Sequence, residues 1–333
     1  MVLVVVVGMG VVVIDEILVR LDLRDAVRTS ALSHAWRDLW KSLSVLSLSF
    51  PLGTHPSVVD SVLLRYIGPR VSLFDIYVDD ASAGRVDDWL LALSCCRVES
   101  IHMRCRLRSV YYFNLHSSIF SFADLASLRL QRCNIPSLPI GFAGFPALQE
   151  LDLKFVHFLA HGENQLEAII RRSPLLHALY MSNVFIPLGC PHSVIEAPNL
   201  RSLTIYSHDD YDWRIGELPC LEDANIQVDI LPTVDDVEMP YTLPFTFYNL
   251  KNLKLYLDFT QMQHILFMFT LLRSCHNLEK LEIELILSKA RLLRTLYVDK
   301  CPDHFDDPLV DLLKCRRASA QARVLFEGLV QQY

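Results

Sequence analysis

The sequence predicts an α/β fold in which a small block of three helices precedes a solenoid of stacked repeats with a parallel sheet on its concave side. Two observations lead to this prediction. Apolar residues over 14–46 recur at the spacing of helical faces, and an L-x-x-L-x-L pattern recurs along the rest of the chain. With 333 residues, 52% of them hydrophobic, the chain is long enough to bury a substantial core.

The helical block is predicted over residues 14–46. Apolar residues fall on one side of three successive segments, and Ser33 can cap the third. Three helices of about three turns each cannot bury Trp36 and Trp40 among themselves, so part of this aromatic surface is expected to meet a partner. Packing of both rings in the core is the alternative. The main apolar positions are Ile14, Ile17, Leu18, Leu21, Leu23, Ala26, Val27, Leu32, Trp36, Leu39, Trp40 and Leu43.

The L-x-x-L-x-L pattern occurs eight times in order, and Val98, Ile101 and Met103 form an earlier, degraded copy. Successive copies start 23, 28, 24, 21, 29, 28 and 15 residues apart, and six of these seven intervals fit leucine-rich repeats of irregular length. The last interval predicts either two strands joined directly or a stretch missing between Ile283 and Leu287, and we favour the missing stretch. The copies start at Leu125, Leu148, Leu176, Leu200, Leu221, Leu250, Leu278 and Leu293.

The repeats predict how this part of the chain is arranged. Each short strand points its Leu positions into the solenoid and can bury them only when neighbouring repeats stack on it. The strands then form a parallel sheet on the concave side, and helical segments such as 163–172 and 261–273 cover the convex side. We expect one solenoid with right-handed connections over residues 98–300.

Composition excludes several classes of partner. The net charge is −7 and the sequence has no basic stripe, which argues against nucleic acid as the main partner. Nine scattered cysteines without a C-x-x-C pair predict a reducing compartment, the cytoplasm or nucleus, and no metal site. The apolar segment 1–13 is shorter than a membrane span, so no membrane association is expected; a signal peptide is the alternative for this segment.

We expect no catalytic residue and no cofactor. The G-x-S-x-G, H-E-x-x-H and phosphate-loop motifs are absent from the sequence. The best polar cluster is residues 208–212 (HDDYD), which we interpret as a solvated loop after the strand that ends at Ile205. A metal or acid–base role is the alternative for this cluster, because His and carboxylates are the usual residues for both.

The strand positions between the Leu anchors are expected to point away from the core, onto the concave face. The acids among them, Glu150, Asp152 and Glu282, predict a partner of basic character. Tyrosine suits recognition because it joins a large contact area to a hydrogen-bonding tip, although its ordinary preference for exposed strands is the alternative. The predicted substrate-binding residues are Tyr180, Tyr206, Tyr256 and Tyr297, and other outward positions include Asp223, Asn225 and Lys280.

Three stretches over residues 14–46 resemble the F-box, particularly its plant version: IDEILVRL, LRDAVRTSALS and AWRDLWKSL. The residues that follow resemble plant F-box proteins with leucine-rich repeats. The tail over 284–333 contains ELILSKARLLRTLYVD and LLKCRRASAQARVLFEG. It is similar to the FBD segment of that group, in a shortened form that overlaps the last repeat. The resemblance covers nearly the whole chain.

The resemblance implies that the F-box docks on the SKP adaptor of a cullin-RING ubiquitin ligase and that the repeats hold an unidentified protein substrate. Two departures from the family pattern leave an alternative, a repeat protein whose F-box no longer engages the ligase. Residues 11–13 are Val-Val-Val where relatives have Leu-Pro and an acidic turn, and residues 21–22 are Leu-Asp where relatives have Leu-Pro. The implied adaptor-facing or supporting residues are Ile14, Ile17, Leu18, Leu21, Leu23, Val27, Leu32, Trp36 and Trp40.

Overall fold

The computed structural model divides the chain into two compact units. The first comprises residues 1–176 and 184–191, and the second comprises residues 177–183 and 192–333. We describe each unit by itself. The structure describes residues 15–16, 18–21, 23–32, 34–106, 112–159, 162–186, 193–207, 213–228, 246–257, 262–285 and 323–327.

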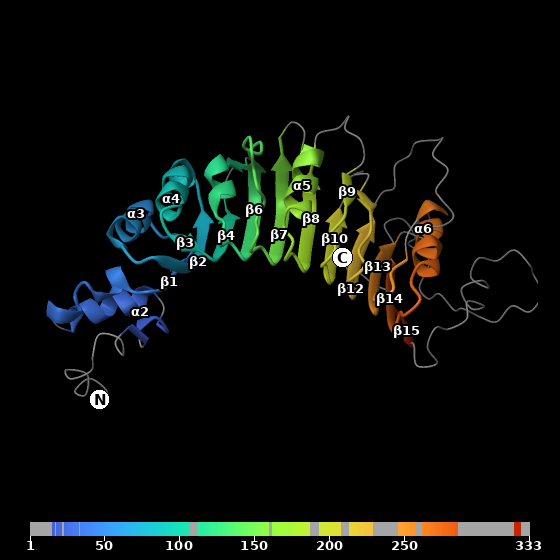
Figure 1. The fold of residues 1–333 in the computed structure, drawn as a ribbon, viewed down its shortest axis with the longest axis horizontal. Coiled ribbons are helices and arrows are strands. Elements are labelled where there is room, and N and C mark those ends of the chain that lie inside the picture. The colour runs from blue at the N-terminus through green and yellow to red at the C-terminus, as the bar shows by residue number, and fades with distance from the viewer. Residues whose placement is uncertain are drawn as a thin grey trace, which may run out of the picture. The chain divides into compact units, whose positions relative to one another are not determined.

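The first unit contains a parallel sheet with the strand order β1-β2-β4-β6-β7, shown from blue to green in Figure 1. The short strands β3 and β5 pair with β2 and β6. Helices or short 3-10 turns lie between most successive strands, as the repeat pattern predicts. The strands are β1 (Leu46–Phe50), β2 (Arg70–Val78), β3 (Arg97–Val98), β4 (Ser100–Cys105), β5 (Phe113–Asn114), β6 (Ser127–Ile135) and β7 (Glu150–Phe158). The helices after β1 are α3 (Pro56–Arg65), η5 (Ala83–Arg85), α4 (Val86–Leu93), η6 (Ser117–Ser121) and α5 (Gly162–Arg171).

Within its described residues, the second unit contains six parallel strands in the order β8-β10-β12-β13-β14-β15. Strands β9 (Ser193–Ile195) and β11 (Trp213–Ile215) form a separate two-stranded sheet. Helix α6 (Met262–Arg273) connects β13 to β14. The main strands are β8 (Ala178–Phe185), β10 (Ser202–Ser207), β12 (Asp223–Val228), β13 (Asn252–Leu257), β14 (Lys280–Leu285) and β15 (Arg323–Glu327).

The leucine pattern builds the core of both units. In the copy before β7, Leu148, Leu151 and Leu153 are at most 2% exposed, and the degraded copy at Val98 is equally buried. In the copies from Leu125 to Leu278 the first residue lies in the turn before its strand, and the next two point to the same side of the sheet because strand side chains alternate. The prediction of an α/β fold with a parallel sheet is therefore confirmed.

The parallel sheet begins before residue 98, the start that the sequence predicts. Leu43, Leu46 and Leu48 form an L-x-x-L-x-L copy that leads into β1, and all three are buried. The resemblance of residues 14–46 to the F-box hides this copy. Strand β2 also keeps the spacing, with Val71, Phe74 and Ile76 buried, but none of the three is a leucine and the sequence pattern therefore missed this copy. One extra residue in β2 shifts its register against β1, where Leu46 pairs with Val71 and Ser47 with Leu73.

The sheet of the second unit ends differently from the prediction. The eighth leucine copy starts at Leu293, and residues 286–322 lie outside the described residues. The strand that pairs with β14 is instead β15, in a backbone register that aligns Lys280 with Arg323 and Glu284 with Glu327. Strand β15 comes from the tail that resembles the FBD segment. A part of that tail therefore continues the parallel sheet.

Three strands contain a non-glycine residue in the left-handed backbone region. These are Arg132 in β6, Phe155 in β7 and Asn183 in β8, with φ of 55°, 51° and 49°. Each lies two residues after the last apolar position of its repeat. In the β6–β7 pair, Arg132 and Phe155 are the residues left out of the strand pairing. Both strands therefore have a bulge at the same level. The bulge lets the apolar positions beyond it face the core again.

Candidate binding surfaces

The helical block before β1 is less regular than the sequence predicts. We expected three helices of about three turns each. The described residues instead form α2 (Leu23–Arg28) and the 3-10 turns η2 (Thr29–Ala31), η3 (His34–Trp36) and η4 (Leu39–Ser42), in addition to a helical turn near Asp15. Hydroxyl groups interrupt the second helix, because the Thr29 hydroxyl donates to the Ala26 carbonyl at 2.7 Å and the Ser30 hydroxyl donates to the Arg37 carbonyl at 2.9 Å.

The structure divides the residues that the resemblance implies for adaptor binding. Leu18, Leu23 and Trp40 are buried, with Trp40 only 4% exposed, so they support the block from inside. Leu32 is 44% exposed, whereas Trp36 is half-buried. Leu21 and Val27 are also half-buried, and Ile14 and Ile17 lie outside the described residues. One tryptophan therefore belongs to the core and the other keeps surface available to a partner.

Hydrogen bonds join this block directly to the repeats of the first unit. The Asp15 carboxylate accepts from the Ser44 backbone N–H at 3.0 Å and from the Ser44 hydroxyl at 2.5 Å. The Tyr66 hydroxyl, after α3, lies 2.5 Å from the Arg70 carbonyl and 3.1 Å from the Leu43 carbonyl. Burial raises the pKa of Tyr66 to about 12. The phenol therefore stays protonated and can keep donating to the backbone.

A close backbone approach fixes the same junction. A Cβ on Gly68 would lie 2.2 Å from the Leu43 carbonyl oxygen and 2.4 Å from the Tyr66 hydroxyl. The Ile67 backbone N–H donates to the Lys41 carbonyl at 2.7 Å, one residue before this contact. Only glycine allows the turn before β2 to come this close to the end of the helical block.

Three of the four predicted recognition tyrosines lie in the second unit, and their orientation agrees with the prediction. Tyr180, Tyr206 and Tyr256 are half-buried on one face of the sheet. Their neighbours on the other face, Leu179, Ile205 and Leu255, are at most 5% exposed: 2%, 5% and 0% in that order. The fourth, Tyr297, and its neighbour Val298 lie outside the described residues, as do residues 208–212, the polar cluster considered for metal or acid–base chemistry.

The three tyrosines form a continuous aromatic row. The ring centroids of Tyr180 and Tyr206 are 5.8 Å apart, and those of Tyr206 and Tyr256 are also 5.8 Å apart. The Asn225 side-chain amide donates to the Tyr206 hydroxyl at 2.7 Å. Burial and the hydrogen bond to Tyr256 raise the pKa of Tyr206 to about 12. Tyr206 therefore accepts from Asn225 and, as a protonated phenol, donates to Tyr256.

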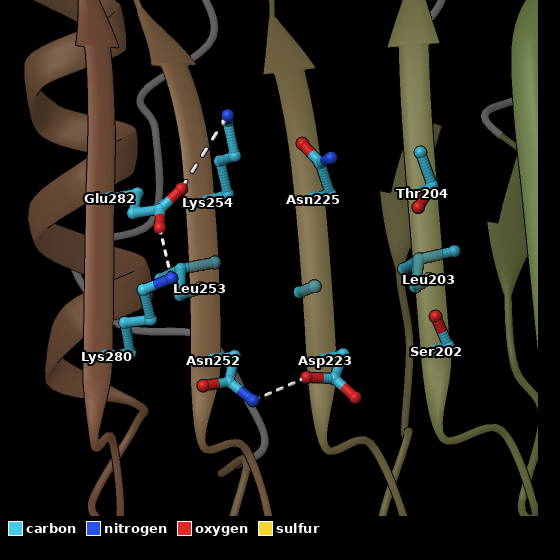
Figure 2. A pocket seen from close by; sticks show the side chains of 11 residues that line it. Ser202, Leu203, Thr204, Asp223, Asn225, Asn252, Leu253, Lys254, Lys280 and Glu282 are labelled. Carbon is cyan, nitrogen blue, oxygen red and sulfur yellow. Dashed lines mark hydrogen bonds and ion pairs between the residues drawn. The ribbon is translucent and has the colours of Figure 1, made fainter. Parts of the chain in front are cut away.

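A groove of about 370 Å³ lies beside this row on β10, β12, β13 and β14 (Figure 2). Short polar side chains form its floor, whereas the long side chains of Lys254, Lys280 and Glu282 stand at one end. Glu282 is ion-paired with both lysines, at 3.6 Å from the Lys254 ammonium group, and these pairs lower the pKa of its carboxyl group. Asn252 donates to the Asp223 carboxylate at 2.6 Å. The floor residues are Ser202, Thr204, Asp223, Asn225 and Asn252.

The sequence did not single out Ser202, Thr204, Asn252 or Lys254. A signal for them was present, because each occupies a position beside a Leu anchor in the same repeat pattern that identified Asp223 and Asn225. What the pattern could not provide was the groove. It exists because the outward side chains of β10 and β12 at this level are short, while those of β14 are long.

Each of the three acids that predicted a basic partner is ion-paired with a neighbour, and the basic character of the partner stays a prediction. Glu150 pairs with Arg129 at 3.0 Å, Asp152 pairs with Lys154 at 3.2 Å, and Glu282 pairs with its two lysines. The partners of Glu150 and Glu282 include residues of adjacent strands, which the spacing of charges along the sequence does not reveal. These acids therefore provide no unbalanced negative charge.

A second polar patch covers the sheet of the first unit. Arg104 on β4 donates to both oxygens of Asp75 on β2, at 2.5 and 2.6 Å, and to the Tyr77 hydroxyl at 2.8 Å. The hydrogen bond to Asp75 raises the pKa of Arg104. His102 lies beside it, and its pKa is lowered by burial and by the Arg129 charge. The charged groups of this patch are paired with one another across the strands.

Other features of the described residues bear on chemistry and location. Among them, no group of three or more His, Cys, Asp or Glu side chains is arranged to hold a metal ion. None of the helices in the described ranges has the length and hydropathy of a bilayer span. The six described cysteines, at 95, 96, 105, 133, 220 and 275, are all free thiols.

Comparisons with known families match both parts of the chain. Residues 10–48 match the family model of the F-box domain. Residues 86–240 match a model described as "FBD-associated F-box protein At5g56370, LRR repeats". The F-box match ends within β1 and the repeat match begins at α4, so α3 and β2 belong to neither match.

Curated proteins of Arabidopsis thaliana are similar to this chain. F-box/FBD/LRR-repeat protein At1g13570 is 26% identical over 81% of this chain and 73% of its own length. F-box/LRR-repeat protein 13 is 27% identical over 58% of this chain and 43% of its own length. F-box/FBD/LRR-repeat protein At1g51370 is 27% identical over 53% of this chain and 40% of its own length. The chain thus spans less than half of the second and third of these relatives.

These matches define a class of protein, that of F-box proteins with leucine-rich repeats. The predicted resemblance to plant F-box proteins with leucine-rich repeats and an associated FBD segment is confirmed. The structure agrees with both parts, since the F-box match falls on the short helices and the repeat match falls on parallel strands.

Proposed function

We propose that the protein is the substrate-receptor subunit of a SKP–cullin–F-box ubiquitin ligase. The observation that carries the proposal is the presence of an F-box match and a leucine-rich-repeat match in one chain. In this role the F-box binds the SKP adaptor and the repeats bind the protein to be ubiquitinated. The chain itself performs no chemical step, because other subunits transfer ubiquitin. Free thiols at the described cysteines suit the cytoplasm or nucleus.

The adaptor-binding surface that we propose is built around Trp36 and Leu32. Both retain exposed area on the helical block, and tryptophan is the residue most enriched at the energetic centre of protein interfaces. Leu21 and Val27 complete the surface. Leu18, Leu23 and Trp40 act from within the block by holding the short helical segments together.

Co-precipitation of the full chain with a SKP adaptor tests this proposal. We expect Trp36→Ala to weaken capture by about thirtyfold or more, which corresponds to the roughly 2 kcal/mol of a true hot spot. Ile140→Ala is the matched control, because Ile140 is fully exposed in the first unit but lies outside the F-box. Capture by folded Trp36→Ala at the wild-type level would exclude Trp36 from the interface. Failure of the wild-type chain to bind any SKP adaptor would reject the ligase role.

The substrate-binding surface that we propose is the aromatic row of Tyr180, Tyr206 and Tyr256, with Tyr297 as a further member expected from the sequence. The row offers large rings, paired hydroxyls and the adjacent groove on one face of the sheet. These features combine area with hydrogen-bonding groups, which is what protein recognition requires.

A second candidate function is a repeat protein that binds its partner without a ligase. The observation that favours it is the sequence of residues 11–13 and 21–22, where hydrophobic or acidic residues replace the Leu-Pro pairs usual in the family. Retained partner binding on the aromatic row, with no adaptor capture by the wild-type chain, would support this candidate over the first.

A further inference from the structure

The groove beside the aromatic row divides into two halves of different character. Over β13 and β14 it is lined by Lys254, Lys280 and Glu282, which neutralise one another in part and leave a net positive charge. Over β10 and β12, the outward positions within the described residues contain no Lys or Arg. They are Ser202, Thr204 and Tyr206 on β10, and Asp223, Asn225 and Gln227 on β12.

The β10–β12 half is rich in hydrogen-bond acceptors whose capacity the fold leaves partly unused. Asn225 Oδ1 is buried and has no hydrogen-bond partner in the structure, because the Asn225 amide nitrogen is the atom that contacts Tyr206. Asp223 is exposed, and within the described part of the chain it accepts from Asn252 but has no cationic partner. A buried carbonyl oxygen without a donor costs about 1–3 kcal/mol, which a ligand that donates to it would recover.

The spacing of these acceptors suits a planar, branched donor. Asp223 and Asn225 are two residues apart on one strand and face the same side, so their side chains start about 6.6 Å apart. The guanidinium group carries five N–H donors in a fixed fork and no acceptor, whereas an ammonium group is a compact point charge. A guanidinium can therefore donate to both residues at once from a single position.

The tyrosines beside the groove favour the same ligand. Tyr180 on β8 pairs in register with Thr204 on β10, and Tyr206 lies two residues further along β10. Their rings, 5.8 Å apart, stand beside the acceptor-rich half. Aromatic faces attract cations, and guanidinium groups stack on them readily. The cation at the neighbouring tyrosine is supplied by the protein, since the Lys254 ammonium group lies 5.0 Å from the centre of the Tyr256 ring.

We propose that the β10–β12 half of the groove binds an arginine side chain of the target protein, with Asp223 and Asn225 as acceptors and the adjacent rings of Tyr180 and Tyr206 as the aromatic contacts. The inference rests on the proposed function, because it assigns a recognition element to the substrate-binding surface. Asp223 balances the guanidinium charge, and Asn225 Oδ1 gains the donor that it lacks. The groove then discriminates arginine from acidic and apolar side chains at this position.

The test measures binding of pentapeptides to the full chain by saturation-transfer NMR at millimolar peptide. The peptides are Gly-Gly-X-Gly-Gly, in which X is Arg, Lys, citrulline or Glu. Citrulline has the shape of arginine without its charge. We expect the Arg peptide to bind tightest, and Asp223→Asn to weaken it about tenfold, in line with one charge-assisted hydrogen bond. Asn225→Asp should strengthen binding. Glu222→Gln is the matched control, because this neighbouring carboxylate is already paired with Arg201.

Equal binding of the citrulline or Glu peptide would overturn the proposal, and equal binding of the Lys peptide would overturn the assignment to arginine. An Asp223→Asn variant that folds normally and binds the Arg peptide as the wild type does would overturn it as well. The proposed function is judged separately by adaptor capture, which does not involve β10 or β12. Adaptor capture without any preference for arginine would reject only the present inference.

Discussion

The Tyr66 hydroxyl lies 3.1 Å from the Leu43 carbonyl oxygen, and this contact joins the last turn of the F-box to the first repeat. Tyr66 follows α3 and Leu43 precedes β1, so 23 residues separate them in sequence. Leu43 has two functions at this point. Its carbonyl accepts a hydrogen bond from the Tyr66 hydroxyl, and its side chain is the first buried leucine of the solenoid.

We expect Tyr66→Phe to lower the free energy of unfolding by about 1–3 kcal/mol, because the carbonyls of Leu43 and Arg70 lose a buried donor. Urea denaturation measures the change. Tyr248→Phe is the control, since Tyr248 is 63% exposed and its phenol can be solvated. Equal stabilities of the two variants would show that the Tyr66 hydroxyl does not hold the junction.

Alkaline pH should destabilise the protein through its buried phenols. The pKa values of Tyr66 and Tyr206 are raised to about 12, above the ordinary value near 10. Their contribution is fully present below pH 10 and is lost as the pH rises towards 12, because the unfolded chain releases these protons first. The double variant Tyr66→Phe/Tyr206→Phe should therefore lose less stability than the wild type between pH 9.5 and pH 11.5 in urea denaturation. An identical loss would contradict the assignment.

Asp60 should contribute to stability and Asp88 should not, although both pair with Arg85. Asp60 lies 3.0 Å from Arg85 and accepts from the buried Trp89 indole N–H at 2.7 Å, whereas the Asp88 side chain is 59% exposed. Asp60→Ala leaves the indole without an acceptor and should cost about 1–3 kcal/mol. Asp88→Ala should change stability by less than about 0.5 kcal/mol. Thermal unfolding at neutral pH compares the two variants.

The same carboxylate predicts the response to acid. The hydrogen bond from Trp89 and the nearby Arg85 lower the pKa of Asp60 below its ordinary value near 3.9. Its stabilising contribution is present above that value and is lost as the pH falls through the lowered folded pKa. The stability difference between wild type and Asp60→Ala should therefore shrink below about pH 4. A stability difference between the two proteins that persists unchanged at pH 2 would show that the Asp60 charge does not contribute to it.

Replacing the aromatic row should separate binding from stability. We expect the triple variant Tyr180→Ala/Tyr206→Ala/Tyr256→Ala to lose capture of the target, with about 2 kcal/mol lost for each hot spot. Its melting temperature should fall modestly, because the rings lie on the outer face while Leu179, Ile205 and Leu255 keep the core. A pull-down from extract with wild-type chain as reference measures capture. Retention of the same targets by the variant would place recognition elsewhere.

The repeats were predictable because their signal is local and redundant. The leucine triplets among the described residues are buried except for the half-buried Leu278, and eight copies in order outweigh chance. The copy at Leu43 was hidden because the same residues resemble the F-box, and the copy in β2 was hidden because Val71, Phe74 and Ile76 keep the spacing without a leucine. The short helices of the block were not predictable, because hydrogen bonds from Thr29 and Ser30 override the apolar period.

The binding surfaces were predictable only in part. Strand alternation correctly placed Tyr180, Tyr206 and Tyr256 on the outer face. The charge balance was not predictable, because Glu150 is neutralised by Arg129 from the adjacent strand. The division of the two tryptophans was also beyond the sequence pattern, since Trp36 and Trp40 share the same helical spacing and only the folded block buries one of them.

The leucine copy that begins at Leu43 has a consequence for how the protein can be cut. A boundary drawn at the end of the F-box, near residue 46, would remove the first turn of the solenoid and expose the edge of β2 as an unpaired strand. Two fragments produced by a cut near residue 46 should aggregate or unfold. A cut after β2 would instead keep the F-box packed against the paired strands β1 and β2. Within the first unit, the helical block and the start of the parallel sheet share the leucine copy at Leu43, so neither is a detachable module.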